Sequence, residues 1–424
     1  MRNRKESGKP TDSHKDTLQK GTALLKDVSS DKFLQDDGTV IFHTEPAAAH
    51  GWFHPIISAN QEPAEKDVDE CIRKLCEKVL RKRYSREQQG EAERRLAWEL
   101  AALRKKETAS LLLFCKEWMD EAKLTAWDIC VRGFTGCSMV AYLIGITDID
   151  PFRFELAPEF FFGYDGEKNV DMMINIPSSL RKEIGKAADI QDRVFTVYRS
   201  GKDHFSLFLH DDLEILRRLS KRTGIKLSHI PYDTDNAIEL FCMGKGAKQN
   251  PIWENIPEFQ NKFIRTLIEK TSPKTFDDWV RIFCLAYGTL SWQEIEEAAW
   301  SKSGKSLDIF SSQEELFISC LHACIPRKEA FQITKIVKLG KADSGRCPQW
   351  KKMRKMMLDA GIEEQSVNAC EKTQYLFSKA HIIAYVQMYQ KIGWFRTHYE
   401  QEYRQVWEEY EKAAMIPVQS DIKY

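Results

Sequence analysis

The sequence has no excess of charge of either sign. Its 424 residues include 63 Lys and Arg and 63 Asp and Glu, so the formal net charge is zero. This balance excludes a uniformly basic nucleic-acid-binding protein and leaves only a local basic surface for a polyanion. No stretch reaches about 18 uninterrupted apolar residues, and the polar N-terminal segment MRNRKESGKPTDSHKD contains no apolar signal region. We therefore expect no membrane span, no membrane partner and a cytoplasmic protein.

The sequence also lacks the paired cysteines of a zinc site. Its 11 cysteines form no CxxC pair, and the closest spacings are Cys71 with Cys76 and Cys320 with Cys324. Because neither has the second pair that a four-ligand site needs, we expect no bound zinc. Cys115 lies in an apolar run, as a reduced thiol of a hydrophobic core does. This pattern supports the cytoplasmic location, because disulfides form in oxidising compartments.

What the sequence does contain is helical periodicity and a few strand patterns. Apolar residues recur with helical spacing from Glu65 to about Arg83, and a second helix is predicted from about Arg86 to Glu121. Strands are predicted at residues 126–131, 170–176, 194–199 and 205–209. The last two flank the segment Ser-Gly-Lys-Asp at 200–203, which predicts a hairpin turn. From about His210 onward the pattern is almost entirely helical.

These patterns predict an α+β fold that is predominantly α. Residues 1–62 are expected to be a polar, partly disordered lead-in. Residues 63–225 hold all the predicted strands and would form a domain with a small mixed sheet, and residues 226–424 would form a helical domain. The chain is long enough for each domain to bury a sizeable core.

Several segments carry a family resemblance. Residues 131–151 read VRGFTGCSMVAYLIGITDIDP, a glycine turn followed by an apolar helix, and residues 159–176 read EFFFGYDGEKNVDMMINI, which ends in a strand. Together with residues 272–292 and 375–399, they resemble the alpha subunit of bacterial DNA polymerase III of the PolC type, a C-family DNA polymerase. The resemblance implies a nucleotidyltransferase-like palm followed by an all-helical fingers domain.

The resemblance also implies that two parts of the family's palm region are missing. Residues 197–201, VYRSG, are similar to the segment that leads into the thumb domain, and residues 210–212 resemble the segment after it. The few residues between them leave no room for a thumb, so we expect weakened DNA binding. The family's zinc insertion would fall between Asp150 and Phe154, where a short Pro-Phe-Arg link closes the gap.

DNA synthesis in this family needs two magnesium ions, which hold the primer hydroxyl and the triphosphate. Two Asp residues at i and i+2 of one strand place both carboxylates on the same face. The matching positions here are Asp171 and Met173, and the third acidic position corresponds to Ser206. A methionine thioether is a poor ligand for a hard cation. Asp171 is thus the one retained catalytic and metal-binding candidate, and the alternative is a capped acid at a strand edge.

Other residues are candidates for phosphate contact. The backbone amides of a glycine turn can cradle phosphate at a helix start. Here the turn departs from the family at Phe134 and Cys137, where serine is usual. The resemblance assigns nucleotide or phosphate binding to Arg132, Gly133, Gly136, Ser138, Lys379 and His381. Candidate DNA contacts are Lys274, Arg281, Lys338 and Lys341, each with the alternative of an ordinary solvated base.

Three functions are compatible with these features. The changes at Met173, Ser206 and Phe134, together with the missing thumb, favour a relative that has lost catalysis. Such a protein would act as a DNA- or protein-binding module, with a replication protein as its partner and no cofactor. The first alternative is a minimal DNA-directed nucleotidyltransferase with residual two-metal activity, which would require Mg²⁺. The second is binding of single-stranded or primer-template DNA without chemistry.

Overall fold

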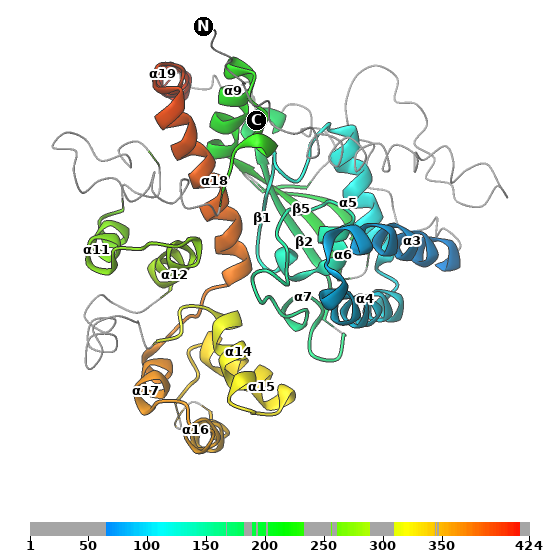
Figure 1. Cartoon of the computed structure of the whole chain (residues 1–424), viewed down its shortest axis with the longest axis vertical. Helices are drawn as coiled ribbons and strands as arrows, with labels where there is room; N and C mark the ends of the chain where they lie inside the picture. Colours follow the sequence, from blue (N-terminus) through cyan, green and yellow to red (C-terminus); the bar gives the residue numbers. More distant parts are fainter. Residues whose placement is uncertain are drawn as a thin grey trace, which may run out of the picture.

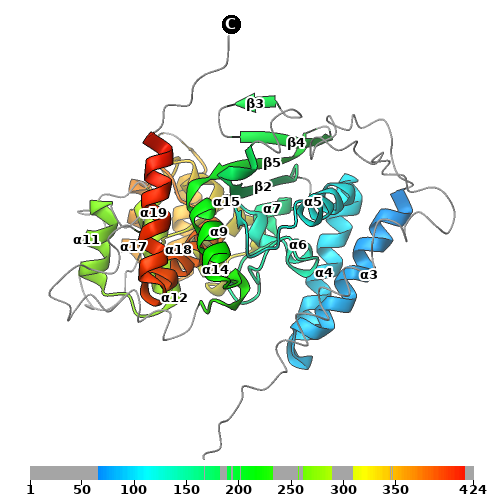
Figure 2. The same ribbon diagram turned by 90° about the horizontal axis from the view of Figure 1, so that it is seen from above.

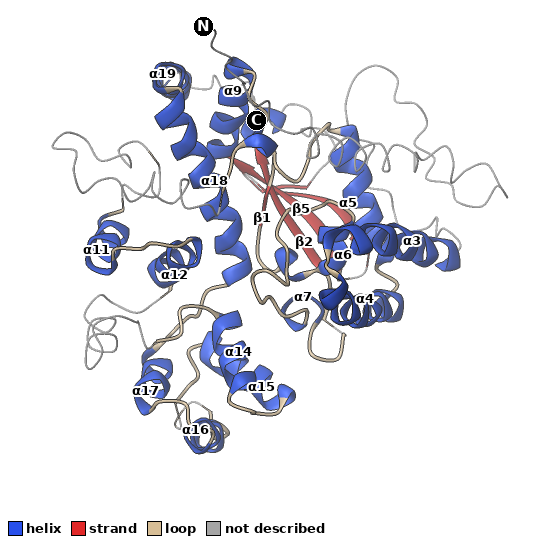
Figure 3. Cartoon of the chain, in the orientation of Figure 1, coloured by secondary structure: helices blue, strands red, loops and turns tan. Residues whose placement is uncertain are grey.

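The computed structural model describes residues 65–166, 168–181, 189–191, 194–200, 202–232, 256, 261–288, 309–343, 345 and 347–415. The expected lead-in at 1–62 lies outside these residues. The fold is α+β and predominantly α, with one small sheet at the centre of many helices (Figure 1, Figure 3). None of the helices in this described part is long and apolar enough to cross a membrane.

The first part of the chain forms helices α3 to α7 and the five strands, joined by short 3-10 turns. Its elements are α3 (Glu65–Arg83), α4 (Arg86–Lys106), α5 (Ala109–Glu121), β1 (Cys130–Val131), η1 (Thr135–Cys137), α6 (Met139–Leu143), α7 (Glu159–Phe162), β2 (Asp171–Pro177), η2 (Ser178–Leu180), β3 (Asp189–Gln191), β4 (Val194–Ser200) and β5 (Asp203–His210). The prediction of a helix at residues 65–83 is confirmed.

The rest of the described chain is helical. Its elements are α9 (Asp211–Thr223), η3 (Leu227–His229), α11 (Lys262–Thr271), α12 (Phe276–Tyr287), α14 (Gln313–His322), α15 (Arg327–Lys338), α16 (Trp350–Asp359), α17 (Glu364–Lys372), α18 (Lys379–His398) and α19 (Glu400–Met415). Helix α9 packs against both β2 and α19, so the first helix after the sheet contacts both parts of the molecule (Figure 2). The domain boundary near residue 225 stays a prediction.

One predicted helix is wrong. The expected continuous helix from Arg86 to Glu121 is divided into α4 and α5 at Glu107 and Thr108. Glu107 has a left-handed φ of 56°, and its amide donates to the carbonyls of Leu103 and Arg104, which ends the first helix. Buried Thr108 then begins the second. Apolar periodicity alone does not reveal such a break, because both helices keep an apolar face.

The sheet has the strand order β1-β2-β5-β4-β3. Strands β2 and β5 are parallel, and the other neighbouring pairs are antiparallel. The predicted hairpin is confirmed, because β4 pairs with β5 from Val194↔Phe208 to Ser200↔Asp203. The strand expected at 126–131 is shorter, since only Cys130 and Val131 pair. Asp128 instead closes a turn by accepting a hydrogen bond from the Thr125 amide at 3.0 Å.

The two faces of the central strands differ. Met172, Ile174, Phe205 and Leu207 are fully buried on one face. The Phe205 ring lies 5.7 Å from Trp118 of α5, in an edge-to-face contact. Burial of each such side chain stabilises the fold by about 1.5–3 kcal/mol. The opposite face carries Asp171 and Asn175 of β2 and His204 and Ser206 of β5, because successive side chains of a strand alternate between faces.

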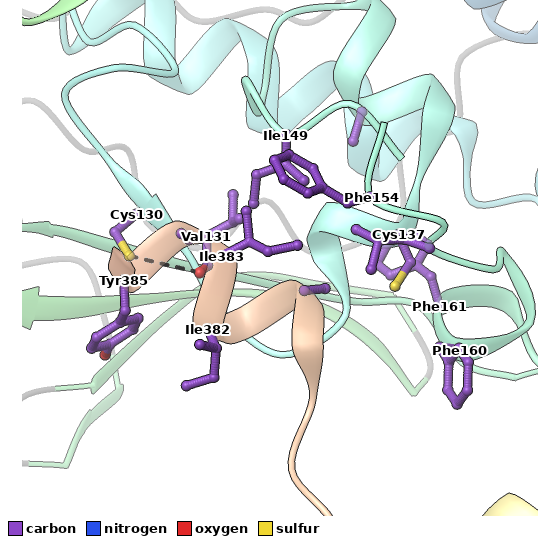
Figure 4. Packing of buried hydrophobic residues seen from close by; sticks show 14 of the residues in the cluster. Cys130, Val131, Cys137, Ile149, Phe154, Phe160, Phe161, Ile382, Ile383 and Tyr385 are labelled. Atoms are coloured by element: carbon purple, nitrogen blue, oxygen red, sulfur yellow. Dashed lines mark hydrogen bonds between the residues drawn. The ribbon is translucent and has the colours of Figure 1, made fainter. Parts of the chain in front are cut away.

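Helix α18 joins the sheet to the helical part of the molecule. Its side chains Ile383 and Tyr385 lie beside Cys130 and Val131 of β1, together with Ile149 (Figure 4). The helix also packs against η1, α9, α12, α14 and α19. The polar face of the sheet therefore lies next to a helix that belongs, by sequence, to the other half of the chain.

Candidate functional site

The parallel pairing of β2 with β5 places the candidate acidic positions side by side. The register aligns Asp171 with His204 and Met173 with Ser206. Because residues at i and i+2 share a face, these four residues form one patch at the beginning of the two strands. Asp171, Met173 and Ser206 thus lie together in the structure, although 35 positions separate Asp171 from Ser206 in the sequence.

Met173 fills the space between the sheet and the glycine turn. Gly133 has a left-handed φ of 56°, and a Cβ built on it would lie 2.4 Å from the Met173 methyl carbon. The Arg132 amide donates to the Met173 carbonyl at 2.8 Å, and Thr135 Oγ1 accepts from the Met173 amide at 3.3 Å. The methyl group of Met173 therefore fills the space between β2 and the glycine turn, at the position where the family resemblance expects a second Asp.

Ser206 is held by a neighbouring strand. It is 5% exposed, and its hydroxyl shares a hydrogen bond of 3.3 Å with the hydroxyl of Thr196 on β4. Asp171 is the one carboxylate of the patch, and its Oδ1 lies 3.1 Å from Nε2 of His204. Burial raises the pKa of Asp171, while the nearby His204 and Lys168 act to lower it. The patch thus offers one carboxylate, a thioether, a hydroxyl and an imidazole.

Arg132 is tied to the next position along the same face. Its guanidinium donates to Asn175 Oδ1 at 3.1 Å and to the Tyr385 hydroxyl at 3.4 Å, and it lies 4.4 Å from the Phe208 ring centroid. Asn175 is fully buried and donates to the Tyr385 hydroxyl at 3.2 Å. His381 packs on Tyr385 with ring centroids 4.8 Å apart. This network connects β2 with α18.

His381 contributes a neutral ring to that network. Burial, together with the positive charges of Arg132 and His210, lowers the pKa of His381 to about 3. Near neutral pH the imidazole can accept or donate one hydrogen bond but carries no charge. Phosphate binding by His381 stays a prediction. It would depend on a hydrogen bond from the neutral imidazole ring and not on a positive charge.

The amides after the glycine turn bind an internal carboxylate. Glu99 of α4 is fully buried and accepts from the amides of Met139 and Val140, both at 3.0 Å, and from the Ser138 hydroxyl at 3.1 Å. Ser138 in turn accepts from the Ala141 amide at 3.1 Å. The first turn of α6, where phosphate binding was predicted for Ser138, is therefore already satisfied by hydrogen bonds within the protein.

The N-terminus of α18 has the same arrangement. Glu314 of α14 is fully buried and accepts from the amide of Lys379 at 2.7 Å and from that of Ala380 at 3.1 Å. The Ser378 hydroxyl lies 2.9 Å from Glu314 and also bonds to the Gly133 carbonyl at 3.2 Å. The Lys379 ammonium donates to the Phe154 carbonyl at 3.0 Å. Lys379 thus joins the two halves of the molecule.

Two lysines meet on the aromatic ring that replaces a serine in the turn. Phe134 stacks on Phe160 at 5.4 Å, and the ammonium groups of Lys168 and Lys338 lie 4.9 and 5.0 Å from its ring centroid. Burial lowers the pKa of both lysines, and the positive charge of Lys338 lowers that of Lys168 further. Like charges brought together in this way attract an anion.

The other DNA-binding candidates are Lys274, Arg281 and Lys341. Lys274 and Lys341 are exposed. Arg281 donates to the Ile309 carbonyl at 2.7 Å and pairs with Glu315 at 3.4 Å, so its guanidinium holds two segments together.

Gly136 lies inside the turn, where a Cβ would come within 3.1 Å of Ile149. Within the described residues, no three His, Cys, Asp or Glu side chains gather as metal ligands.

Sequence reasoning missed four residues of the site. His204, Lys168, Glu99 and Glu314 belong to it through contacts across the chain. Strand alternation was a usable signal for His204, because it precedes Ser206 by two positions on β5. The two glutamates gave no such signal, since a Glu in a helix is usually solvated.

Two family models match the chain. Residues 70–193 match the bacterial DNA polymerase III alpha NTPase domain, and residues 211–357 match the finger domain of the same subunit. The DNA polymerase III PolC-type of Mycoplasma pneumoniae is 30% identical over 201 residues, which are 46% of this chain and 14% of that protein. The Thermotoga petrophila protein is 30% identical over 199 residues, 45% of this chain and 14% of its own length. The chain therefore matches about one-seventh of the length of these relatives.

Proposed function

Because the chain is a relative of the alpha subunit of bacterial DNA polymerase III, PolC type, we propose that it is a replication protein that binds DNA or a protein partner without synthesising DNA. The matches to the alpha NTPase and finger domains support a role in replication. The proposal that catalysis is lost depends on the patch at the start of β2 and β5.

The observation that carries this proposal is the pairing of Met173 with Ser206. A pair of magnesium ions requires carboxylates that bridge the two ions. At these positions the chain has a thioether that packs over Gly133 and a hydroxyl that bonds to Thr196. The donor set does not fit a two-magnesium site, because Asp171 is its one carboxylate and two Mg²⁺ ions need several anionic oxygen ligands.

Primer extension tests the loss of catalysis. We expect no nucleotide incorporation by the full chain at high protein concentration, with either Mg²⁺ or Mn²⁺. The matched comparison is Asp171→Ala, which removes the one carboxylate of the patch. Incorporation by the unchanged chain that disappears in Asp171→Ala would overturn the proposal and favour the minimal nucleotidyltransferase.

A basic surface on the helical part supports binding of DNA. Residues 327–355 contain ten Lys and Arg but two Asp and Glu, a net charge of +8 in a chain whose total is zero. Six lysines of this segment are exposed and have no ion pair with the described residues; they are Lys328, Lys335, Lys341, Lys351, Lys352 and Lys355. Unpaired lysines on adjacent helices α15 and α16 are the kind of surface that binds phosphate groups.

An electrophoretic shift assay at several salt concentrations tests this binding. We expect the full chain to shift DNA at low salt and to lose affinity steeply as salt rises, because bound phosphates release counterions. Charge reversal at Lys351 and Lys352 should weaken binding at least about tenfold. The same reversal at exposed Lys78 and Lys82 of α3 is the control and should have little effect. A flat salt response would leave a protein partner as the ligand.

A further inference from the structure

Asp171 and His204 form a second kind of site on the polar face of the sheet. They are register partners on the parallel strands β2 and β5, and Asp171 Oδ1 lies 3.1 Å from His204 Nε2. Their side chains are 33% and 37% exposed, while Asp171 Oδ1 itself is buried and has no hydrogen-bond partner among the described residues. His204 has no counterpart among the carboxylates expected for the two-magnesium site, and it supplies a nitrogen donor.

The orientation of His204 is determined by its other ring nitrogen. His204 Nδ1 lies 3.2 Å from the carbonyl oxygen of Lys202, in the turn between β4 and β5. A carbonyl oxygen can only accept, so Nδ1 carries the proton of this bond. In the neutral ring Nε2 then presents its lone pair on the side of Asp171. Metal-binding histidines are commonly oriented in this way, with the second nitrogen donating to a carbonyl group.

The contact between the two side chains has the dimensions of a chelate. Ligand atoms that bind one ion at about 2.1 Å and at right angles lie about 3.0 Å apart. The observed distance between Nε2 and Oδ1 is 3.1 Å, yet Oδ1 accepts no hydrogen bond from the described residues. An ion bound beside the line between the two atoms suits this geometry better than a shared proton does.

We propose that Asp171 and His204 chelate a single divalent ion of a first-row transition metal, such as Mn²⁺. An imidazole nitrogen favours these ions over Mg²⁺, which prefers oxygen ligands. Water would complete the coordination, since no third His, Cys, Asp or Glu of the described residues gathers there. One ion held by one carboxylate has no bridging ligand, so the site does not restore the two-metal arrangement of DNA synthesis.

The positive charge of Lys168 also acts on this site. Its positive charge acts on Asp171, and its ammonium also lies on the Phe134 ring beside Lys338. A cation bound to Asp171 is therefore repelled by Lys168. Removal of this charge in Lys168→Gln should tighten metal binding by about threefold. An anion gathered by the lysines would reduce the same repulsion.

Electron paramagnetic resonance of the full chain titrated with Mn²⁺ tests the proposal. We expect one bound ion per chain, with a coupling to a ligand nitrogen in the pulsed spectrum. His204→Gln should abolish that coupling and weaken binding at least about tenfold, and Asp171→Asn should weaken it by a similar factor. His322→Ala, at an exposed histidine in the last turn of α14, is the matched control and should leave both unchanged.

The outcomes separate this inference from the proposed function. Circular dichroism and thermal unfolding without metal establish that each variant is folded. No bound Mn²⁺, or a nitrogen coupling that persists in His204→Gln, would overturn the metal site and leave the loss of catalysis untouched. Nucleotide incorporation that requires Asp171 would overturn the loss of catalysis, even where the single ion binds as expected.

Discussion

At the scale of single residues, two buried glutamates determine how much of this site is open to an anion. Glu99 binds the amides at the start of α6, and Glu314 binds those at the start of α18. A phosphate at either helix start would have to displace an internal carboxylate. The charge available to an external anion therefore comes from side chains such as Lys168 and Lys338, which meet on Phe134.

Replacement of Glu314 by Gln tests this role. The amide side chain has one acceptor oxygen, so one of the Lys379 and Ala380 amides would face an NH₂ group instead. We expect Glu314→Gln to lower the free energy of unfolding by about 2–3 kcal/mol in urea denaturation at neutral pH. Glu411→Gln, at an exposed position of α19, is the control. Equal stability of the two variants would show that Glu314 is not required as an ionised cap.

Prediction from sequence succeeded where the signal was local and failed where it was not. Met173 and Ser206 were identified from the family resemblance of their local segments, and the register places them side by side. Lys168 joins the site through its contact with Phe134, 34 positions earlier in the chain. Helical or strand periodicity contains no information on such contacts, because it reports which face is buried and not what lies against it.

At the scale of elements, the division between α4 and α5 shows the same limit. Arg86 to Glu121 carries enough apolar periodicity for one long helix, yet Glu107 adopts a left-handed conformation that ends α4. The break turns the chain so that α5 covers the apolar face of the sheet through Trp118. A residue-by-residue propensity for helix does not detect it, because Glu is a good helix former.

Replacement of Glu107 by Gly should stabilise the protein. Glycine adopts a φ of 56° without the steric cost that a Cβ brings, so we expect a gain of about 0.5–1 kcal/mol in thermal or urea unfolding. Ala97→Gly, at an exposed position inside α4, should instead cost about 1 kcal/mol. A loss of stability in both variants would contradict the left-handed cap at Glu107.

At the scale of the whole molecule, α18 makes the two halves of the chain one structure. It packs against β1 and η1 on one side and against α12, α14 and α19 on the other. Arg132 and Asn175 of the sheet region bond to its Tyr385, and its Lys379 bonds to Phe154. The fold class and the presence of a small mixed sheet followed by helices could be predicted from periodicity. The bridging position of α18 could not, because it rests on contacts more than two hundred residues apart in sequence.

Ile383→Ala tests whether the halves unfold together. Ile383 is fully buried where α18 meets β1 (Figure 4), so truncation should cost about 2–5 kcal/mol. If α18 belongs to both halves, hydrogen exchange measured by mass spectrometry will show an equal loss of protection in β2, β5 and α12. Loss of protection in α12 and α18 alone, with the strands unchanged, would contradict a single cooperative unit. In that case the sheet would keep its own stability, and the bonds from Arg132 and Asn175 to Tyr385 would act as a separable contact between two domains.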